Sequence, residues 1–504
     1  MTATSLAGND PSPAPTAGFD RWSAASDRLN PILVREVMQA VKGRAFLLTI
    51  LGALLVTVVI ATGVVQDGDS GARSGKDAFS AGLATLAPLL LFVVPNGAYH
   101  SMRTELRAGI VEQLLLSRLR PTSIVLGKLF AAMVQFVLYV SVLAPLLATS
   151  YLLRGVDLPT IGLSLVFALA LCVGATASAI SAAAQGMLPA LQSLTNVAMS
   201  LALGLGTFVV AIYVGTGEYL RDLGWLLRST EFGMVVSLVI GGALLGTVLS
   251  ILTAQSFLMH AYENRSTQFR VFLFAVVALT FGWLWAFVDP ANRAEAVWGI
   301  VSFLTLLGAV FGLFMVTEQR DLSPRLAAHV PSSRLAALAA APFLPGRDRG
   351  MLAFLIHVAV LLAIAGACST LSVPRSLTQM PFAIAAYALF WLGVARLLRG
   401  RLPSVTGANN VTRLLLPFTM LLAILLPLLF DVFAFGGVTA WHPGHVLNPF
   451  WTIDEIVFRH RFANERAVLV TAIVALSVLQ LPSVMRGVRE VLTASAARAK
   501  GARG

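Results

Sequence analysis

Twelve stretches of the sequence are long and apolar enough to cross a lipid bilayer as helices. The hydrocarbon core is about 30 Å thick, and a helix of about 20 apolar residues spans it. Helices are expected because lipid offers no hydrogen-bond partners to an open backbone. The predicted fold class is therefore all-α, a polytopic transmembrane helix bundle of about 12 spans. The expected spans are residues 45–65, 78–99, 129–153, 158–184, 190–214, 232–256, 271–288, 295–316, 351–369, 379–395, 414–435 and 466–484.

The composition excludes an ordinary soluble protein. Hydrophobic residues make up 57% of the chain and charged residues only 12%, whereas a soluble domain carries about 25% charged residues. A soluble fold needs a polar exterior, which this chain could not supply. The formal charge of +12 would suit a nucleic-acid-binding protein. However, the basic residues lie between the expected spans, with Arg466 at a span boundary, so no nucleic-acid partner is predicted.

The distribution of Lys and Arg predicts the orientation in the membrane. If the N-terminus lies inside, the inner segments hold 26 of the 36 basic residues and the outer loops hold 10. Inner loops of membrane proteins are enriched in Lys and Arg, which also meet the anionic lipid of that face. We therefore expect a multi-pass protein of the inner (plasma) membrane, with both termini in the cytoplasm and the lipid bilayer as a partner.

The segments outside the spans suggest a division of the chain into six parts. The first part is rich in Pro, Ala, Ser, Thr and Gly, which is typical of disorder. The second has apolar residues near helical spacing with basic residues between them, although a solvated leader is the alternative. The predicted parts are a disordered leader at 1–20, an amphipathic surface helix at 21–43, a six-span core at 45–256, a cytoplasmic linker at 257–270, a second six-span region at 271–484 and a basic cytoplasmic tail at 485–504.

The segment after the second span predicts a short cytoplasmic helix over 103–119. An apolar residue recurs every four positions along it, at Leu106, Ile110 and Leu114. Pro121 is expected to end this helix, and Ser123 can cap the next one. An apolar ridge with a charged flank suits docking to a soluble partner. A juxtamembrane helix that lies on lipid is the alternative.

Residues 105–129, ELRAGIVEQLLLSRLRPTSIVLGKL, have a pattern of charged and small residues that resembles the signature of type-2 ABC exporter permeases. The matching residues are Glu105, Arg107, Gly109, Glu112, Leu114, Leu115, Ile124, Gly127 and Lys128. Upstream, the segment 30–36, NPILVRE, is similar to the opening that the family has before its first span. Two features depart from the family pattern. Ile110 replaces the usual Thr, and residues 117–121 replace a short Thr-Pro-type segment.

The resemblance implies a six-span permease that dimerises above a separate cytoplasmic ABC ATPase subunit. The helix at 103–119 would be the coupling helix, seated in a groove of that ATPase, and the helix at 21–43 would be the connecting helix beside it. The implied ATPase contacts are Glu105, Arg107, Gly109, Glu112, Leu114 and Leu115. The implied connecting-helix residues are Asn30, Pro31, Arg35 and Glu36, and the third-span entry is Gly127 and Lys128.

The sequence has no phosphate-binding loop of the Gly-x-x-x-x-Gly-Lys-Ser/Thr type. In that loop the backbone and the Lys hold the nucleotide phosphates, and the hydroxyl residue holds Mg²⁺. Gly75-Lys76 and Gly127-Lys128 lack the upstream Gly and the hydroxyl residue. We therefore expect a transport subunit that is not itself an enzyme and carries no cofactor, with ATP and Mg²⁺ on the partner subunit. The sequence does not identify the transported substrate.

The second six spans depart from the six-span plan. The inner loop 317–350 is long and basic like 100–128, and the outer loop 436–465 is long like 215–231. These parallels suggest a degenerate repeat, but the motif around Gly109 has no second copy. An accessory membrane domain is the alternative. Assembly as a homodimer, with another permease subunit or as a single-chain pseudo-dimer stays open.

Three histidines of the last outer loop and one acidic span residue are weaker candidates. His442, His445 and His460 could offer metal ligands, but Pro443-Gly444 breaks the helical geometry that the first two would need. Surface histidines are expected, and no metal site is predicted. Asp431 is the only acidic residue within an expected span and is a functional candidate for that reason. Its place near the end of the span predicts a hydrated helix end instead.

Two other classes of membrane protein also fit twelve spans. A secondary transporter usually carries ionisable residues near the membrane midplane, and none is expected in this chain. A polytopic membrane enzyme needs convergent catalytic side chains, and no such set is evident. The preferred interpretation is the permease subunit of an ATP-driven exporter. Co-purification with a small soluble ATPase would distinguish it from both alternatives.

Overall fold

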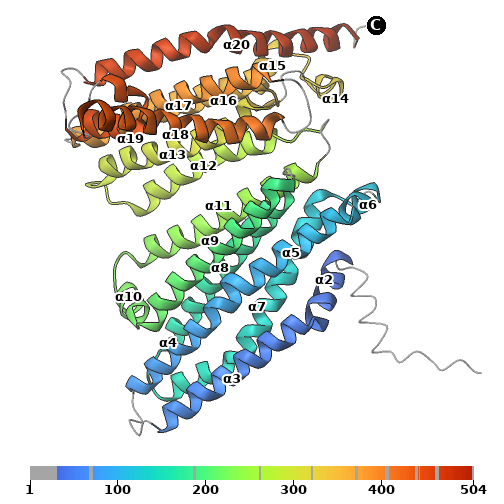
Figure 1. Ribbon diagram of the computed structural model, residues 1–504, viewed down its shortest axis with the longest axis vertical. Coiled ribbons are helices and arrows are strands. Elements are labelled where there is room, and N and C mark those ends of the chain that lie inside the picture. The colour runs from blue at the N-terminus through green and yellow to red at the C-terminus, as the bar shows by residue number, and fades with distance from the viewer. Residues whose placement is uncertain are drawn as a thin grey trace, which may run out of the picture. The chain divides into compact units, whose positions relative to one another are not determined.

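Helices make up all the regular structure in the part of the chain that the computed structural model describes, where no strand occurs. Twelve of these helices are long and apolar enough to cross a membrane. The predicted all-α polytopic bundle is therefore confirmed (Figure 1). The expected leader at 1–20 lies outside the described residues. These are 31–66, 72–117, 119–185, 189–259, 263–318, 322–368, 373–402, 408–436, 441, 443–459 and 465–501.

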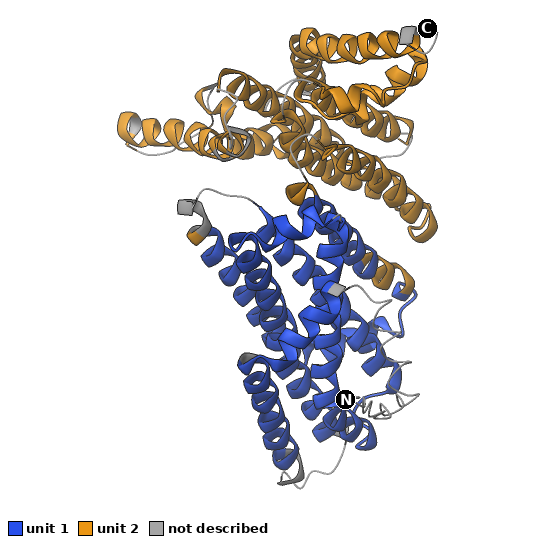
Figure 2. Ribbon diagram, turned by 90° about the vertical axis from the view of Figure 1, so that its right-hand side faces the viewer, with its two compact units in different colours: residues 1–185, 195–232, 239–255 blue, residues 186–194, 233–238, 256–504 orange. Residues whose placement is uncertain are grey.

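The chain divides into two compact units, of which the first comprises residues 1–185, 195–232 and 239–255 (Figure 2). The helices of the first half are α2 (Pro31–Lys42), α3 (Arg44–Gln66), α4 (Ala72–Pro88), η1 (Leu89–Val93), α5 (Val94–Arg107), α6 (Ile110–Leu116), α7 (Pro121–Leu152), α8 (Leu158–Ala184), α9 (Pro189–Gly215), α10 (Glu218–Leu226) and α11 (Phe232–Leu258).

The second unit comprises residues 186–194, 233–238 and 256–504. The main division therefore falls beside the end of the expected six-span core. The helices of the second half are α12 (Thr267–Phe287), α13 (Arg293–Val316), α14 (Pro324–Ala327), α15 (Arg334–Ala340), η2 (Ala341–Phe343), α16 (Arg347–Ala367), α17 (Arg375–Arg401), α18 (Ala408–Phe435), η3 (Pro443–Leu447), α19 (Pro449–Ile453), η4 (Asp454–Phe458) and α20 (Glu465–Gly501).

The second span of unit 1 is an α-helix interrupted by a π-helical turn, and it lies at the centre of the packing. It begins as α4, passes through the π-helix η1 and continues as α5. Pro88 has no backbone N–H, so it breaks the α-helical hydrogen-bond ladder where the wider turn begins. α4 packs on α7, and α5 packs on α8. The buried core of the unit includes Phe79, Leu86, Leu90, Tyr139 and Leu143.

Unit 2 repeats this packing order around its own second span. α13 packs against both α16 and α17, just as the second span of unit 1 packs against the third and fourth. Gly308 and Gly312 of α13 permit the close approach, since a Cβ at either position would lie within 2.6 Å of His357 or Leu392. In both halves, short helices also follow the second span and precede the last one. The two halves, whose loop lengths are similar, thus also resemble each other in how their helices pack.

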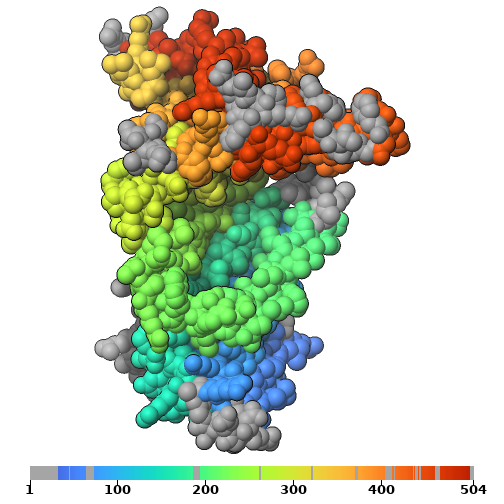
Figure 3. Space-filling view, turned by 90° about the vertical axis from the view of Figure 1, so that its left-hand side faces the viewer, coloured from blue at the N-terminus to red at the C-terminus, as the bar shows by residue number. Residues whose placement is uncertain are grey.

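The peripheral helices present apolar side chains outward. In the most apolar windows of α3, α9 and α11, only 11% of residues are buried. The green helices α9 and α11 lie at the surface on the face drawn in Figure 3. Their exposed side chains include Leu201, Phe208, Leu238 and Leu244. So much exposed apolar surface is unfavourable in water and suits the hydrocarbon region of a bilayer, as expected of a multi-pass membrane protein.

The helix predicted over 103–119 is in fact two helices. Gly109 has a φ of 70°, a left-handed conformation that glycine adopts without steric cost, and it separates α5 from α6. The expected helix end at Pro121 also differs, because α6 ends at Leu116 and the proline is the first residue of α7. Arg120 before it is extended, as the residue before proline usually is.

Two further boundaries differ from the sequence prediction. The expected tail at 485–504 is largely helical, because α20 continues without a break to Gly501. Helices also occupy both ends of the expected linker at 257–270, since α11 reaches Leu258 and α12 begins at Thr267. The expected surface helix at 21–43 corresponds to α2, of which the described part runs from Pro31 to Lys42, and residues 21–30 lie outside the described chain.

Candidate functional site

Four charged side chains from three separate segments meet in unit 1, and we call them the buried ion cluster. They are Arg35 and Glu36 of α2, Glu105 of α5 and Lys128 of α7. The Lys128 Nζ lies 2.8 Å from Glu36 Oε1 and 2.9 Å from Glu105 Oε2. Arg35 forms ion pairs with both carboxylates, at 3.0 Å to Glu36 Oε1 and by a short contact to Glu105. Each base therefore contacts both acids.

The cluster is shielded from solvent and electrically balanced. The side chains of Lys128, Glu105 and Glu36 have exposed fractions of 0%, 9% and 10%. Arg35 is half-buried at the edge. Two acids and two bases leave no net charge, which is the condition under which buried charges are tolerated. Removing one partner from such a group is costly because the remaining charge stays uncompensated.

A serine adds two hydrogen bonds to the cluster. Lys128 Nζ donates to Ser101 Oγ at 2.7 Å, and Ser101 Oγ donates to Glu36 Oε2 at 3.1 Å. Sequence analysis did not single out Ser101. The only available signal was that Ser101 and Glu105 lie four residues apart, on one face of a helix.

The electrostatic setting keeps Glu36 ionised. Burial by itself raises the pKa of Glu36, because it disfavours the charged carboxylate. The charge of Lys128 and hydrogen bonds from Lys128, Arg35 and Ser101 lower the pKa by more, so the net shift is downward. At neutral pH the carboxylate of Glu36 therefore carries a negative charge.

Helical spacing places the cluster residues. On α2 the buried Ile32 precedes Glu36 by four residues, and on α7 the buried Ile124 precedes Lys128 by four. Residues four apart share a helix face, so each ion is directed inward with an apolar neighbour. α2 packs along α7, and α5 also contacts α7. These contacts bring the three faces together at one end of the unit 1 helices, where α2 and α6 both lie (Figure 1).

Arg103 fixes the end of α5 to a fourth helix. Its Nη1 donates to the backbone carbonyls of Ala183 and Gln185, each at 3.2 Å. These carbonyls belong to the C-terminal end of α8, where a cation also complements the helix dipole. The sequence contains no local signal for this contact, which joins residues 80 positions apart.

The short helix α6 follows directly and is mostly outside the packed interior. Val111 is 1% exposed and anchors the helix, and Leu114 and Leu115 are half-buried. Glu112 and Gln113 are exposed, and Leu116 is 80% exposed. The outer face of α6 therefore combines an acidic, an amide and an aliphatic side chain.

The structure thus separates the predicted site residues into two groups. Arg35, Glu36, Glu105 and Lys128 are brought together, and Gly127 is buried beside Lys128. Arg107, Gly109, Glu112, Leu114 and Leu115 lie outside the cluster, at the end of α5 and on α6. Glu105, which the family resemblance implied as a contact to the ATPase, is buried in the cluster. Asn30 lies outside the described residues, and Pro31 begins α2.

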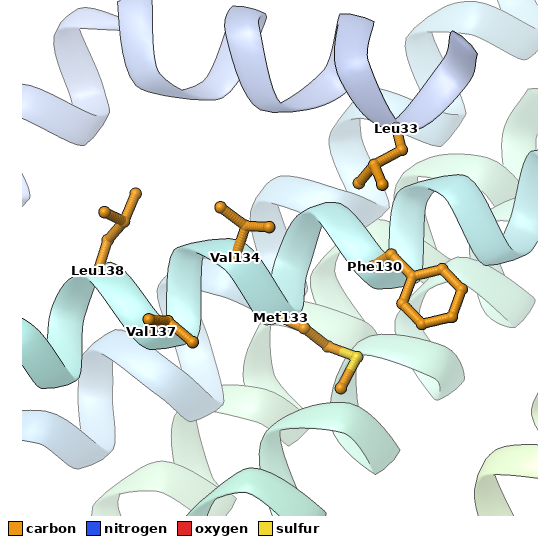
Figure 4. A pocket seen from close by; sticks show the side chains of 6 residues that line it. All are labelled: Leu33, Phe130, Met133, Val134, Val137 and Leu138. Atoms are coloured by element: carbon orange, nitrogen blue, oxygen red, sulfur yellow. The ribbon is translucent and has the colours of Figure 1, made fainter. Parts of the chain in front are cut away.

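An apolar groove runs beside the cluster between α2 and α7 (Figure 4). The groove is lined by Leu33, Phe130, Met133, Val134, Val137 and Leu138. None of these side chains can ionise or donate a hydrogen bond, so the groove offers no catalytic chemistry. Its lining resembles the other lipid-facing surfaces of the unit.

Two expectations about the outer loop and the last spans were wrong. Asp431 is 2% exposed and lies 2.8 Å from His445 Nε2, so it is not a hydrated helix end, and His445 is fully buried instead of lying at the surface. The ring of Trp451 covers His445 at a centroid distance of 4.3 Å. His442 and His460 lie outside the described residues. No group of metal-ligating residues occurs among the residues that the structure describes.

The expectation that no ionisable residue lies mid-span was also wrong. His357 is at the centre of α16 and is fully buried. Its Nε2 lies 3.0 Å from the carbonyl oxygen of Leu304, on the neighbouring α13. Gly308, whose missing side chain leaves room for the ring, is one turn further along α13. These contacts place the ring of His357 in the interface between two spans.

Comparisons with known proteins add no assignment to this geometry. No family model matches the chain, and neither a curated protein nor a solved structure is significantly similar to it.

Proposed function

We propose that the chain is the membrane-spanning permease subunit of an ATP-driven exporter and that a separate cytoplasmic ABC ATPase subunit binds at α6. The observation that carries this proposal is the buried ion cluster. It joins α2, the end of the second span and the start of the third span at the base of α6. The residues involved come from two motifs far apart in the sequence, both of which resemble this permease family.

The cluster would make the end of α5, from which α6 continues, mechanically rigid. A force applied to α6 passes to α5, whose Glu105 and Arg103 are tied to α2, α7 and α8. Separating these helices would leave buried charges without their partners, which is unfavourable, so the helices are expected to move together. The ATPase can drive this movement only if its nucleotide states bind the permease states with different affinities. ATP and Mg²⁺ would be held by that subunit.

The composition of α6 favours a protein partner over lipid. A helix that lies on lipid would be expected to direct its aliphatic residues toward the membrane and its charges toward water. On α6 the aliphatic Val111 and the half-buried leucines face the chain itself. The exposed Leu116 shares the outer face with Glu112 and Gln113. Such a mixed face fits a protein groove, where an apolar anchor is surrounded by polar contacts.

The test is Glu112→Lys in the full-length protein purified from native membranes. Wild-type protein should bring with it a soluble ATPase and nucleotide-hydrolysing activity. The charge reversal should lower its affinity for that ATPase by about tenfold, roughly 1.4 kcal/mol. Glu218→Lys makes the same charge change on exposed α10, between the fifth and sixth spans. That control should retain the ATPase, and equal retention by both variants would contradict the proposal.

A proton-coupled secondary transporter is the second candidate, because two observations favour it. His357 is ionisable and lies mid-span, and Asp431 pairs with His445 in a buried site. Both arrangements occur in proton-driven transporters. Transport by the purified chain in vesicles, driven by a proton gradient and without any ATPase, would favour this candidate over the first.

A further inference from the structure

The apolar groove between α2 and α7 is bounded at both ends by contacts between helices. At one end, Lys128 of α7 pairs with Glu36 of α2 at 2.8 Å. At the other end, the hydroxyl oxygen of Tyr139 of α7 lies 2.7 Å from the hydroxyl oxygen of Thr49 of α3. Between these two contacts the helix is interrupted at Gly43, where α2 ends and α3 begins. The chain is therefore joined to α7 on both sides of the groove.

Side chains of both helices point into this groove. In Figure 4, Leu33 of α2 extends toward α7, and Val134 and Leu138 of α7 extend toward α2. The lining is completed by Phe130, Met133 and Val137. No lining side chain offers a strong hydrogen bond. Apolar cavities exclude water and accept apolar molecules, so the lining favours a hydrocarbon occupant.

The groove is continuous with the surface of the protein that meets lipid. α7 is a candidate membrane span from Pro121 to Leu152, which includes all its lining residues. Phe130, Val134 and Val137 are 47%, 37% and 58% exposed, so the groove has an open side. In the hydrocarbon region of a bilayer, acyl chains surround such a surface. The bilayer itself can therefore supply the occupant.

The size of the groove favours a single hydrocarbon chain over a second protein helix. Phe130 and Leu138 are eight positions apart, so the lining extends about 12 Å along α7. The empty space is about 670 Å³, with its open side included. A helix segment of that length and about 10 Å in diameter occupies about 900 Å³. A helix of a second copy is therefore too large for the groove, whereas an acyl chain is much narrower.

We propose that this groove binds one acyl chain of a membrane phospholipid. The chain fills the space beside the buried ion cluster and contacts α2 and α7 together. Since the lining has no polar side chain, the site recognises the acyl chain and not the headgroup. A ligand that bridges two helices in the folded state stabilises their association. The bound chain therefore helps to hold α2 against α7.

The test uses the full-length protein in a detergent with a rigid steroid tail, which is too wide for the groove. Phosphatidylcholine with a photoreactive diazirine in one acyl chain is added in increasing amounts. After irradiation, mass spectrometry measures labelling of residues 130–138 of α7 and of residues 238–248 of α11, another outward-facing apolar segment. Labelling of 130–138 should saturate, as expected of a binding site, whereas labelling of 238–248 should rise in proportion to the lipid.

Filling the groove should remove the site. Val134→Trp places an indole in the groove and should lower the apparent affinity measured at 130–138 by about tenfold. Val248→Trp is the matched control on α11, where the valine is 43% exposed against 37% for Val134. It should leave the labelling of 130–138 unchanged. If Val134→Trp does not fold, Val137→Phe provides the same comparison with a smaller side chain.

Three results would overturn the proposal. The first is labelling of 130–138 that does not saturate or that the groove-filling variant leaves unchanged, because it would indicate transient contact with lipid. The second is labelling by phosphatidylglycerol with the same photoreactive chain but not by phosphatidylcholine, because it would indicate a headgroup site. The third is capture of a second copy of the chain by a photo-crosslinking amino acid at Met133, because the groove would then be a contact between copies.

Discussion

Lys128 shows that a charge at the start of a span can be an internal structural element. From its position before an apolar run, we predicted only that Lys128 lies where the third span begins. In the structure its side chain has no exposed area and reaches Glu36, 92 residues earlier in the chain. Local sequence cannot supply that pairing, because nothing near Lys128 indicates which acids will face it. The family resemblance singled out Glu36, Glu105 and Lys128 but gave no indication of their mutual contact.

Lys128→Met should destabilise the protein strongly, because Glu36 and Glu105 would remain buried without a compensating charge. The expected loss is about 3–5 kcal/mol of unfolding free energy, measured by denaturation of the protein in detergent micelles. Lys42→Met is the matched control, since Lys42 is exposed at the end of α2. Its effect should be within about 0.5 kcal/mol. Equal stability of Lys128→Met and the wild type would contradict the cluster.

At the scale of single elements, apolar runs predicted the spans well because lipid imposes one solution on the backbone. The interruptions were harder to predict. A wider π turn follows Pro88 inside the second span, and Gly109 divides the expected coupling helix. Both are backbone events within helix-forming sequence. The composition of the segment 103–119 alone favours one continuous helix.

Gly109→Val should disturb the junction between α5 and α6 while leaving the spans intact. The position has open space around it, so the cost comes from the left-handed backbone, about 1–2 kcal/mol for a residue with a Cβ. We expect loss of ATPase co-purification with normal membrane insertion. Gly97→Ala on α5 is the control, because Gly97 is exposed, has equally open space and has no such backbone conformation. It should be neutral or slightly stabilising. If both variants retained the ATPase, the conformation at Gly109 would not matter for docking.

At the scale of the whole molecule, composition and the spacing of apolar runs were sufficient to predict the fold class. They could not reveal that each unit is organised around its second span, because this depends on long-range packing. The motif of unit 1 has no second copy in the sequence. Unit 2 instead secures its helix ends with Arg270–Glu318 and Arg349–Glu490. Different residues therefore join the helix ends in the two units. For this reason a comparison of the two halves of the sequence does not reveal that their helices pack in a similar order.

The central claim is that α6 docks a nucleotide-hydrolysing protein. Its most direct test is a photo-crosslinking amino acid placed at Gln113, which is exposed on α6, in cells that express the full-length chain. The account predicts capture of a soluble protein that has a phosphate-binding loop, with a yield that changes when nucleotide is depleted. Capture of phospholipid alone, at a yield that nucleotide does not alter, would contradict it.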